Sequence, residues 1–337
     1  MKKYNILFRI SGGRAKNKEL GMGHIYRAMN LSANLKSHNL FFLVEDYGGA
    51  INVLKQNGFS NIKKLKPEIK LSDDVSTTKN IVNLNAIDVI IVDKFDSTTK
   101  KYVKYCKNFS KIVVIPDVDK IDYDADLVIN GFIGFKNSEI RNRYNTKCLL
   151  GPKYQILNKQ YFSVSIRIPK KFTLLATFGG FDANNIIPRF CKSLKPFQYF
   201  FKTKIILGPA TKKSKLQSIK LDKNQVSIIH KTKNMKKEIL QAKYGICSGG
   251  ITTYEFANLG IPFATICQYP HQQKTAKSWK SYGLAMNLGS LDKSFEKRLN
   301  IFLRKIASDK FNLKTNPNLV DGLGSKRVSK EVLSILK

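Results

Sequence analysis

"YGICSGGITTYEFANLGIP", residues 244–262, reads as a buried strand that ends in a glycine turn and continues as a helix. This order is the repeating unit of a parallel sheet, and glycines let a phosphate approach the free N–H groups at the start of the helix. Two other stretches repeat the order, FRISGG…GMGHIYR at 8–27 and ATFGGFDANN at 176–185. Three such turns predict a phosphorylated ligand at the carboxyl ends of the strands.

Short apolar runs alternate with helical stretches along the whole chain, which predicts an α/β protein built from parallel sheets. The runs are 4–10, 39–45, 86–93, 111–117 and 125–130 in the first half, and 172–180, 203–208, 225–230, 244–250 and 262–267 in the second. We expect two Rossmann-like, doubly wound domains with a ligand cleft between them, at residues 1–150 and 151–337. Residues 324–337 form an amphipathic helix that could pack back on the first half.

The composition is that of a globular protein, with 337 residues of which 42% are hydrophobic. The five cysteines form no C-x-x-C pair and are odd in number, which favours a reducing compartment, and we expect a cytoplasmic protein. No run of about 18 apolar residues occurs, so we expect no membrane-spanning helix.

The net charge of +35 can indicate an anionic partner such as nucleic acid, a lipid surface or a phosphorylated substrate. Lysines dominate and are spread along the chain, as amino-acid drift would produce, and no segment combines arginine with aromatic residues as nucleic-acid-binding surfaces do. A basic nucleic-acid-binding protein is therefore the least favoured function, whereas peripheral membrane contact stays open.

The glycine turns have alternative interpretations. Gly21 and Gly23 with Glu45 resemble a dinucleotide-binding motif, but Arg27 stands near the place of the third glycine and the loop before Gly21 is long. Thr252 and Glu255 could form a capping box, or Glu255 could accept hydrogen bonds from the hydroxyls of a ribose. The glycine pair before Thr252 favours ligand binding.

Taken together, the motifs resemble the UDP-sugar hydrolases of pseudaminic acid biosynthesis, a family grouped with spore-coat polysaccharide proteins. The resemblance rests on stretches that follow one another over nearly the whole chain: GMGHIYR, LLGPKYQIL, ATFGGFDANN, KNMKKEILQAKYGICSGGITTYEFANLGIP and DGLGSKR. More remotely, they are similar to the peptidoglycan N-acetylglucosaminyltransferase and other glycosyltransferases of the GT-B fold. The resemblance implies a GT-B-like fold in which the second domain binds UDP and the first faces the sugar.

The family match also implies roles for particular residues. His24 would be the general base that activates water for attack at the anomeric carbon, with UDP leaving. Sugar-binding residues would be Gly23, Arg27, Asp93, Asp117, Asn130, His271 and Gln272. Nucleotide-binding residues would be Gly179, Gly180, Asp182, Asn234, Met235, Ser248, Gly249, Gly250, Thr252 and Glu255.

His24 has chemistry that suits this role, because an imidazole with a pKa near 6.5 can take up a proton at neutral pH. A helix N-terminus disfavours its charged form, which should keep it available as a base. The alternative is a helix-start residue that hydrogen-bonds the backbone. Arg27, one turn later, would be salt-bridged or would face a phosphate.

Three positions depart from the family pattern, namely Ser11, Phe95 and His271, and all three lie where the sugar would be recognised. Asp117 and Asn130 match family positions, but buried polar residues that cap strand ends are an equal alternative for both. The identity of the sugar and of the acceptor therefore stays open.

We expect a monomeric enzyme without cofactor or metal that hydrolyses a UDP-linked amino or deoxyamino sugar of the diacetamido-trideoxyhexose type, releasing UDP and free sugar. This reaction would serve nonulosonic acid and surface polysaccharide biosynthesis. The alternative is an inverting GT-B glycosyltransferase that uses a UDP-sugar donor and a hydroxyl acceptor instead of water.

Overall fold

The computed structural model describes residues 2–13, 21–94, 97–162, 169–180, 182, 184–208, 219–230, 232 and 234–337. The chain divides into two compact units, Met1–Phe162 with Gly322–Lys337, and Ser163–Asp321. Residues 151–162 therefore lie with the first unit, and the C-terminal end of the chain also belongs to it.

The first unit contains one sheet with eight strands in its described residues, in the order β3-β2-β1-β4-β5-β6-β8-β7. The strands are β1 Asn5–Gly12, β2 Asn39–Asp46, β3 Ile62–Leu65, β4 Val89–Asp93, β5 Lys111–Val114, β6 Leu127–Asn130, β7 Ser138–Arg141 and β8 Lys147–Leu150. Only β7 is antiparallel to its neighbour within this described part. The winding direction reverses between β1 and β4, and ligands of doubly wound sheets bind at the carboxyl ends beside such a reversal.

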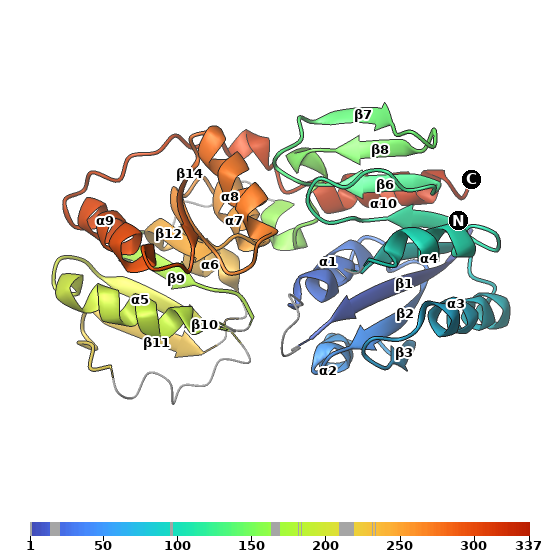
Figure 1. Ribbon diagram of the computed structural model, residues 1–337, viewed down its shortest axis with the longest axis horizontal. Coiled ribbons are helices and arrows are strands. Elements are labelled where there is room, and N and C mark those ends of the chain that lie inside the picture. Colours follow the sequence, from blue (N-terminus) through green and yellow to red (C-terminus); the bar gives the residue numbers. More distant parts are fainter. Residues whose placement is uncertain are drawn as a thin grey trace. The chain divides into compact units, whose positions relative to one another are not determined.

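The helices of the first unit are α1 Gly23–Ser32, α2 Ala50–Gln56, α3 Leu71–Asn85, α4 Thr99–Cys106 and α10 Gly324–Ser334, with short 3-10 turns at Pro152–Tyr154 and Lys159–Phe162. Helix α10 contacts α1 within this unit (Figure 1). Its Ser325 hydroxyl donates to the Leu157 carbonyl at 2.8 Å, and Lys147 pairs with Glu331 at 2.8 Å. The amphipathic pattern of residues 324–337 thus corresponds to a helix of the first unit.

The second unit contains a six-stranded parallel sheet in its described residues, in the order β11-β10-β9-β12-β13-β14. The strands are β9 Phe172–Thr177, β10 Thr203–Leu207, β11 Val226–His230, β12 Ala242–Ser248, β13 Phe263–Cys267 and β14 Ala285–Ser290. The helices are α5 Ile186–Leu194, α6 Met235–Leu240, α7 Thr252–Asn258, α8 Gln272–Ser281 and α9 Phe295–Ala307, with 3-10 turns at Lys195–Phe197 and Pro317–Leu319. The winding reverses between β9 and β12, so both units share one doubly wound topology and the predicted α/β class is confirmed.

Apolar strand residues and the inner faces of the helices form a core in each unit. In the first unit Leu7, Ile90 and Val92 pack with Tyr102 and Val103 of α4. In the second unit the buried faces of α5 and α9 cover β9 and β10. At about 25 cal/mol per Å² of apolar surface removed from water, these contacts supply the main driving force for folding.

A buried ion cluster interrupts the core of the first unit. The Arg9 guanidinium, fully buried in β1, donates to both carboxylate oxygens of Asp74 at 2.8 Å and to Glu45 at 3.1 Å. The Lys94 ammonium donates to Asp74 at 2.9 Å. Two cations face two anions, and Glu45 also accepts from Tyr47, so the carboxylate considered above for a dinucleotide ribose is used within the fold.

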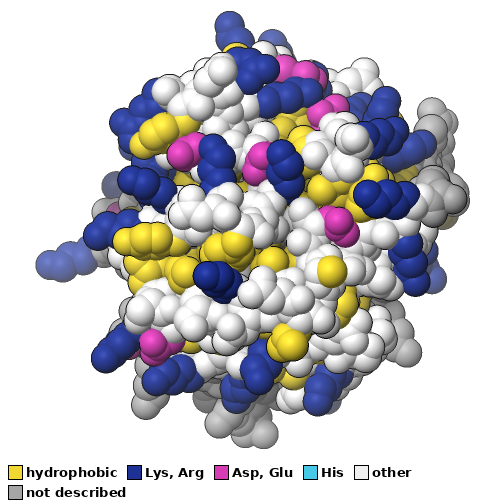
Figure 2. Space-filling view, turned by 90° about the vertical axis from the view of Figure 1, so that its right-hand side faces the viewer, with side chains coloured by type: hydrophobic (Ala, Val, Ile, Leu, Met, Phe, Trp, Pro, Cys, Tyr) yellow, Lys and Arg dark blue, Asp and Glu magenta, His cyan; other side chains and the backbone are white. Residues whose placement is uncertain are grey.

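The surface is basic over a wide area. On the face shown in Figure 2, Lys and Arg side chains are spread in all directions, and Asp and Glu side chains are few. This spread agrees with the even distribution of lysines along the sequence. Within the described residues, no helix has the length and apolarity needed to cross a bilayer.

Candidate active site

Helix α1 starts close to the carboxyl end of β1 because Gly12 leaves room for it. A Cβ atom at Gly12 would come within 2.6 Å of the Ile25 Cγ1 atom. The strand β4 lies beside β1 with Ile10 opposite Asp93, so the last residue of β4 reaches the same end of the sheet. The first turn of α1 and the end of β4 therefore meet at the winding reversal.

Asp93 joins two side chains of α1 at this point. Its Oδ1 atom lies 2.6 Å from His24 Nδ1, and its Oδ2 atom accepts from Arg27 Nε at 2.7 Å. Arg27 Nη2 also donates to Asp93 Oδ1 at 2.5 Å. The Asp93 side chain is 1% exposed, whereas those of His24 and Arg27 are 12% and 18% exposed. A buried acceptor thus orients a base and a cation whose outer atoms reach the surface.

Asp117 completes the cluster from the segment after β5. Its Oδ1 atom accepts from Arg27 Nη2 at 3.5 Å, and its Oδ2 atom lies 3.9 Å from His24 Nε2. The second distance is longer than a hydrogen bond, so Nε2 is not bonded to Asp117. With Nδ1 donating its proton to Asp93, Nε2 carries the lone pair of the neutral imidazole and is the atom that can act as a base.

The pKa values follow from these contacts. Burial acts to lower the pKa of His24, but the charges of Asp93 and Asp117 outweigh it, and the pKa lies above its ordinary value of 6.5. Burial acts to raise the pKa of Asp93, but the Arg27 and His24 charges lower it to about 2. Asp93 is therefore ionised throughout the physiological range and favours the imidazolium form of His24.

The pKa of His24 is therefore shifted in the direction opposite to the one expected from the helix N-terminus alone, because the two carboxylates outweigh burial. A helix terminus carries a partial charge of about half a unit, whereas Asp93 and Asp117 present two full charges close to the ring. The neutral form of His24, which is the form that can accept a proton, is therefore less populated at a given pH than in a free imidazole. Arg27 is salt-bridged, which was one of its two predicted roles.

Three other residues singled out in the first unit, Gly23, Ser11 and Asn130, are described by the structure. Gly23 is exposed at the start of α1, and Ser11 is buried near the end of β1. Asn130 ends β6 and is 2% exposed, and both polar atoms of its amide are hydrogen-bonded to the backbone. Phe95 lies outside the described residues.

In the second unit, two glycine turns follow β9 and β12. Gln268, the first residue after β13, ties these turns together: its Nε2 atom donates to the Phe178 carbonyl at 2.8 Å and to the Ser248 hydroxyl at 2.5 Å. Gly179 and Gly180 directly follow Phe178, and Gly249 and Gly250 follow Ser248. The sequence prediction missed Gln268, although its place just after a buried strand was a usable signal.

The start of α8 adjoins the second turn. Gln272 accepts from the backbone N–H of Gln268 at 2.9 Å, and a Cβ atom at Gly249 would come within 3.0 Å of the Gln272 Cβ atom. His271 precedes α8, and its ring stacks on Tyr269 with centroids 5.9 Å apart. The structure thus places both predicted late-loop residues beside the glycine turn of β12.

Several predicted nucleotide residues also hold helix ends. Asp182 accepts from the backbone N–H groups of Ile186 and Ile187 at 2.6 and 3.1 Å, at the start of α5. Asn234 caps α6 through Lys237 N–H at 3.0 Å, and Met235 is the first residue of that helix. These contacts show local structural roles; nucleotide contacts for the three residues stay predictions.

The capping-box alternative for Thr252 and Glu255 does not hold. The N-cap residue of α7 is Ile251, and no side chain caps this helix. The neighbouring Thr253 hydroxyl donates to the Gly250 carbonyl at 2.7 Å, which fixes the turn. Glu255 is half-buried one turn into α7, and its charge together with burial raises the pKa of Cys247.

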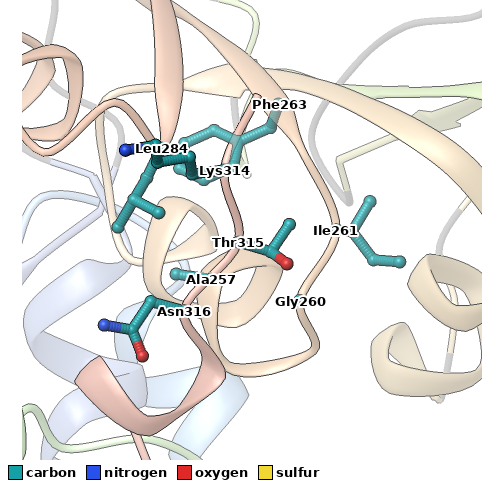
Figure 3. Close-up of a pocket in the computed structure, with 8 residues that line it drawn as sticks. All are labelled: Ala257, Gly260, Ile261, Phe263, Leu284, Lys314, Thr315 and Asn316. Atoms are coloured by element: carbon teal, nitrogen blue, oxygen red, sulfur yellow. The ribbon is translucent and has the colours of Figure 1, made fainter. Parts of the chain in front are cut away.

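A small hollow elsewhere in the second unit is a different feature. It is lined by Ala257, Gly260, Ile261, Phe263, Leu284, Lys314, Thr315 and Asn316 (Figure 3). Phe263 is the first residue of β13, so the hollow lies at the amino end of that strand, opposite Gln268. It therefore does not belong to the candidate ligand-binding edge.

Within the described part of the chain, no group of three or more His, Cys, Asp or Glu side chains could hold a metal ion. The metal-independent reaction stays a prediction.

No family model matches the chain. It is 29% identical over 285 residues to an uncharacterized protein of Methanocaldococcus jannaschii, a match that covers 76% of this chain and 55% of that protein, so the chain spans about half of that relative's length. It is 26% identical over 330 residues to the spore coat polysaccharide biosynthesis protein SpsG of Bacillus subtilis, covering 92% and 94% of the two chains.

Two solved structures superimpose on nearly the whole length of this chain. The Acinetobacter baumannii MurG structure superimposes with a TM-score of 0.65 at 13% identity, covering 98% of this chain and 99% of that chain. The Staphylococcus aureus MnaA–UDP structure also gives 0.65, at 12% identity, covering 99% and 97%. These likenesses establish a GT-B-like fold, as predicted.

Proposed function

We propose that this chain acts on a UDP-linked sugar in polysaccharide biosynthesis, and that it hydrolyses the bond between UDP and an amino or deoxyamino sugar. The similarity to the spore coat polysaccharide protein SpsG and the fold likeness to MurG and to the UDP-bound MnaA support a UDP-sugar-using enzyme. Assembly of a nonulosonic acid such as pseudaminic acid would be the pathway, as the family resemblance implies.

The observation that carries the hydrolytic reaction is the Asp93 carboxylate bound at once to His24 Nδ1 and Arg27. A base oriented by a buried carboxylate, with its second nitrogen too far from Asp117 for a hydrogen bond, is an arrangement that suits general-base catalysis. Arg27 offsets the charge of Asp93, so Asp93 can hold the His24 ring without itself taking up the proton.

In the proposed step, a water oxygen forms a bond to the anomeric carbon of the sugar while its proton passes to His24 Nε2. The bond between that carbon and the β-phosphate oxygen breaks, and UDP leaves with the electron pair. Asp93 stabilises the imidazolium that forms. Such proton transfer contributes about 10²–10⁴-fold to a rate.

The second unit would bind UDP. The glycine turns after β9 and β12 offer backbone N–H groups to the diphosphate, and Glu255 can accept from the ribose hydroxyls. The fixed turns, held by Gln268 and Thr253, are suited to stabilise the negative charge of the departing UDP.

A glycosyl transfer to a hydroxyl is the second candidate, because the sequence resemblance extends to the peptidoglycan N-acetylglucosaminyltransferase. The same base would then activate an acceptor hydroxyl. Release of UDP with water as the sole acceptor separates the two reactions.

Two substitutions test the assignment of the two units. For His24→Ala we expect UDP release to fall at least about 100-fold with UDP affinity unchanged, because the base acts only in the chemical step.

For Glu255→Ala we expect UDP binding to weaken by about 1–3 kcal/mol, because hydrogen bonds to a charged acceptor are lost. Calorimetry with UDP and a UDP-release assay measure both.

Full turnover in His24→Ala would remove His24 from the mechanism. Unchanged UDP affinity in Glu255→Ala would remove Glu255 from the nucleotide site. Glu296→Ala is the matched control, because it removes the same charge in the same unit. Glu296 lies on α9 and pairs with Arg189 of α5.

A further inference from the structure

The segment between β5 and β6 carries Asp117 and has an unusual backbone. Val118, directly after Asp117, has a φ angle of +48°. A β-branched residue rarely adopts this left-handed region, so surrounding contacts must hold the chain there. Pro116 precedes Asp117 and restricts the backbone on its other side.

Asn130 supplies the holding contacts. Its Nδ2 atom donates to the Val118 carbonyl at 2.6 Å and to the Lys120 carbonyl at 3.0 Å, and its Oδ1 atom accepts from Phe132 N–H at 3.0 Å. The β6 strand on which it stands is paired on both sides, with β5 and β8. A side chain of a strand that is paired on both sides therefore fixes the carbonyls of Val118 and Lys120.

We infer that Asn130 is a positioning residue: its amide holds residues 117–120 in the conformation that keeps the Asp117 carboxylate beside His24 and Arg27. The side chain is 2% exposed and its amide is engaged on both atoms, so it acts through Asp117 and not by touching the sugar. Its effect on turnover rests on the proposed function, whereas its effect on His24 does not.

The charged groups that face His24 within the described residues come from three elements. Asp93 ends β4, Arg27 lies one turn further on α1, and Asp117 follows β5. Asp93 and Arg27 make short, direct contacts with each other, whereas Asp117 lies 3.9 Å from the His24 ring. Asp117 is therefore the group whose distance depends most on how its own segment is held.

The chain offers a matched control in Asn142. Its Nδ2 atom donates to the Ile121 and Tyr123 carbonyls at 2.8 and 2.9 Å, and its Oδ1 atom accepts from two backbone N–H groups. Asn142 thus fixes the next part of the same loop with the same kind of hydrogen bonds. The first carbonyl that it binds, that of Ile121, lies four residues beyond Asp117.

The test is the titration of His24, followed by NMR of the ring protons in the full chain. His24 is one of four histidines, and its signal is assigned by its loss in His24→Gln. In Asn130→Ala we expect the His24 midpoint to move to lower pH, because the Asp117 charge is no longer held near the ring. In Asn142→Ala we expect no shift. UDP release should fall about tenfold or more in Asn130→Ala only.

The background variant Asp117→Asn decides whether the effect runs through Asp117. We expect Asp117→Asn alone to lower the midpoint, and Asn130→Ala to add nothing in that background. An equal shift in both backgrounds, an equal shift in Asn142→Ala, or no shift in Asn130→Ala would each overturn the inference. If Asn130→Ala does not fold, Asn130→Ser, which keeps one donor, takes its place with a smaller shift in the same direction. A shifted midpoint in a chain that releases no UDP from any UDP-sugar would uphold the clamp and reject the proposed function.

Discussion

Asp93 is almost fully buried and accepts hydrogen bonds from two side chains of one helix, so its carboxylate acts on both at once. With His24 it fixes which ring nitrogen carries the proton, and with Arg27 it forms a charge-assisted pair. Since the pKa of Asp93 is held at about 2, it would not take the proton from His24 in the proposed reaction. Its role is to orient and to stabilise.

The pH dependence of turnover follows from these charges. The base form of His24 is the neutral imidazole, and its pKa lies above 6.5, so kcat/KM should rise with pH through a midpoint above 6.5. Asp93→Asn removes the negative charge that favours the imidazolium, so the midpoint should move to lower pH while the maximal rate falls. A pH–rate profile of both proteins measures this.

The matched control is Asp88→Asn, just before the other end of β4, where the carboxylate accepts from Asn5 N–H at 2.7 Å. It should leave the midpoint in place. If the midpoint does not move in Asp93→Asn, a group other than His24 sets the rise of kcat/KM with pH.

At the scale of elements, the buried ion cluster joins β1, β2 and α3 to the residue that follows Asp93. Arg9 and Lys94 share the Asp74 carboxylate, and burial would raise the pKa of Asp74 if these two cations did not lower it. Removing one member of such a cluster leaves an uncompensated buried charge. The cluster thus makes the end of β4 sensitive to α3.

For Asp74→Asn we therefore expect the free energy of unfolding to fall by about 3–5 kcal/mol, measured by denaturant unfolding. Asp73→Asn is the control, because this substitution removes the same charge from α3. Asp73 is the exposed neighbour of Asp74. It should change the stability by less than about 0.5 kcal/mol. Equal effects of the two substitutions would mean that the cluster does not stabilise the fold.

Much of the fold was predictable at this scale because buried parallel strands leave continuous apolar runs, and glycine turns mark the ends of β1, β9 and β12. The ion cluster was not predictable, since Arg9 in an apolar run has partners on two other elements that only the folded chain brings together. For the same reason the contact between His24 and Asp93 was not predicted, and the family resemblance had assigned Asp93 to the sugar.

The site residues differ in how much of their chemistry could be predicted from the sequence. The sequence predicted that Arg27, one turn after His24, would be salt-bridged or face a phosphate, but it did not predict that Asp93 binds both side chains. For Asn130 the sequence left open a sugar contact or a buried polar role at a strand end, and its amide is bonded to the segment that carries Asp117. The direction of the His24 pKa shift was missed because Asp93 and Asp117, whose charges raise it, come from distant parts of the sequence.

The whole molecule consists of two units with the same doubly wound strand order, and each has its functional residues at the carboxyl edge beside the winding reversal. The first unit carries a base with its orienting acid, and the second carries glycine turns held by side chains. The predicted cleft between the halves stays a prediction. In the proposed reaction, the first unit would act on the reacting carbon and the second would bind the leaving nucleotide.

The most direct test of the central claim is UDP release from a panel of UDP-amino sugars in ¹⁸O-water, with a chelator present and no other acceptor. Mass spectrometry of the products measures the yield of UDP and free sugar and the position of the label. We predict equal amounts of UDP and free sugar, with no ¹⁸O in the UDP, because water attacks the anomeric carbon, and release by His24→Ala that is at least about 100-fold slower. Label in the UDP, or no release from any sugar by the wild-type chain although UDP binds, would contradict the account.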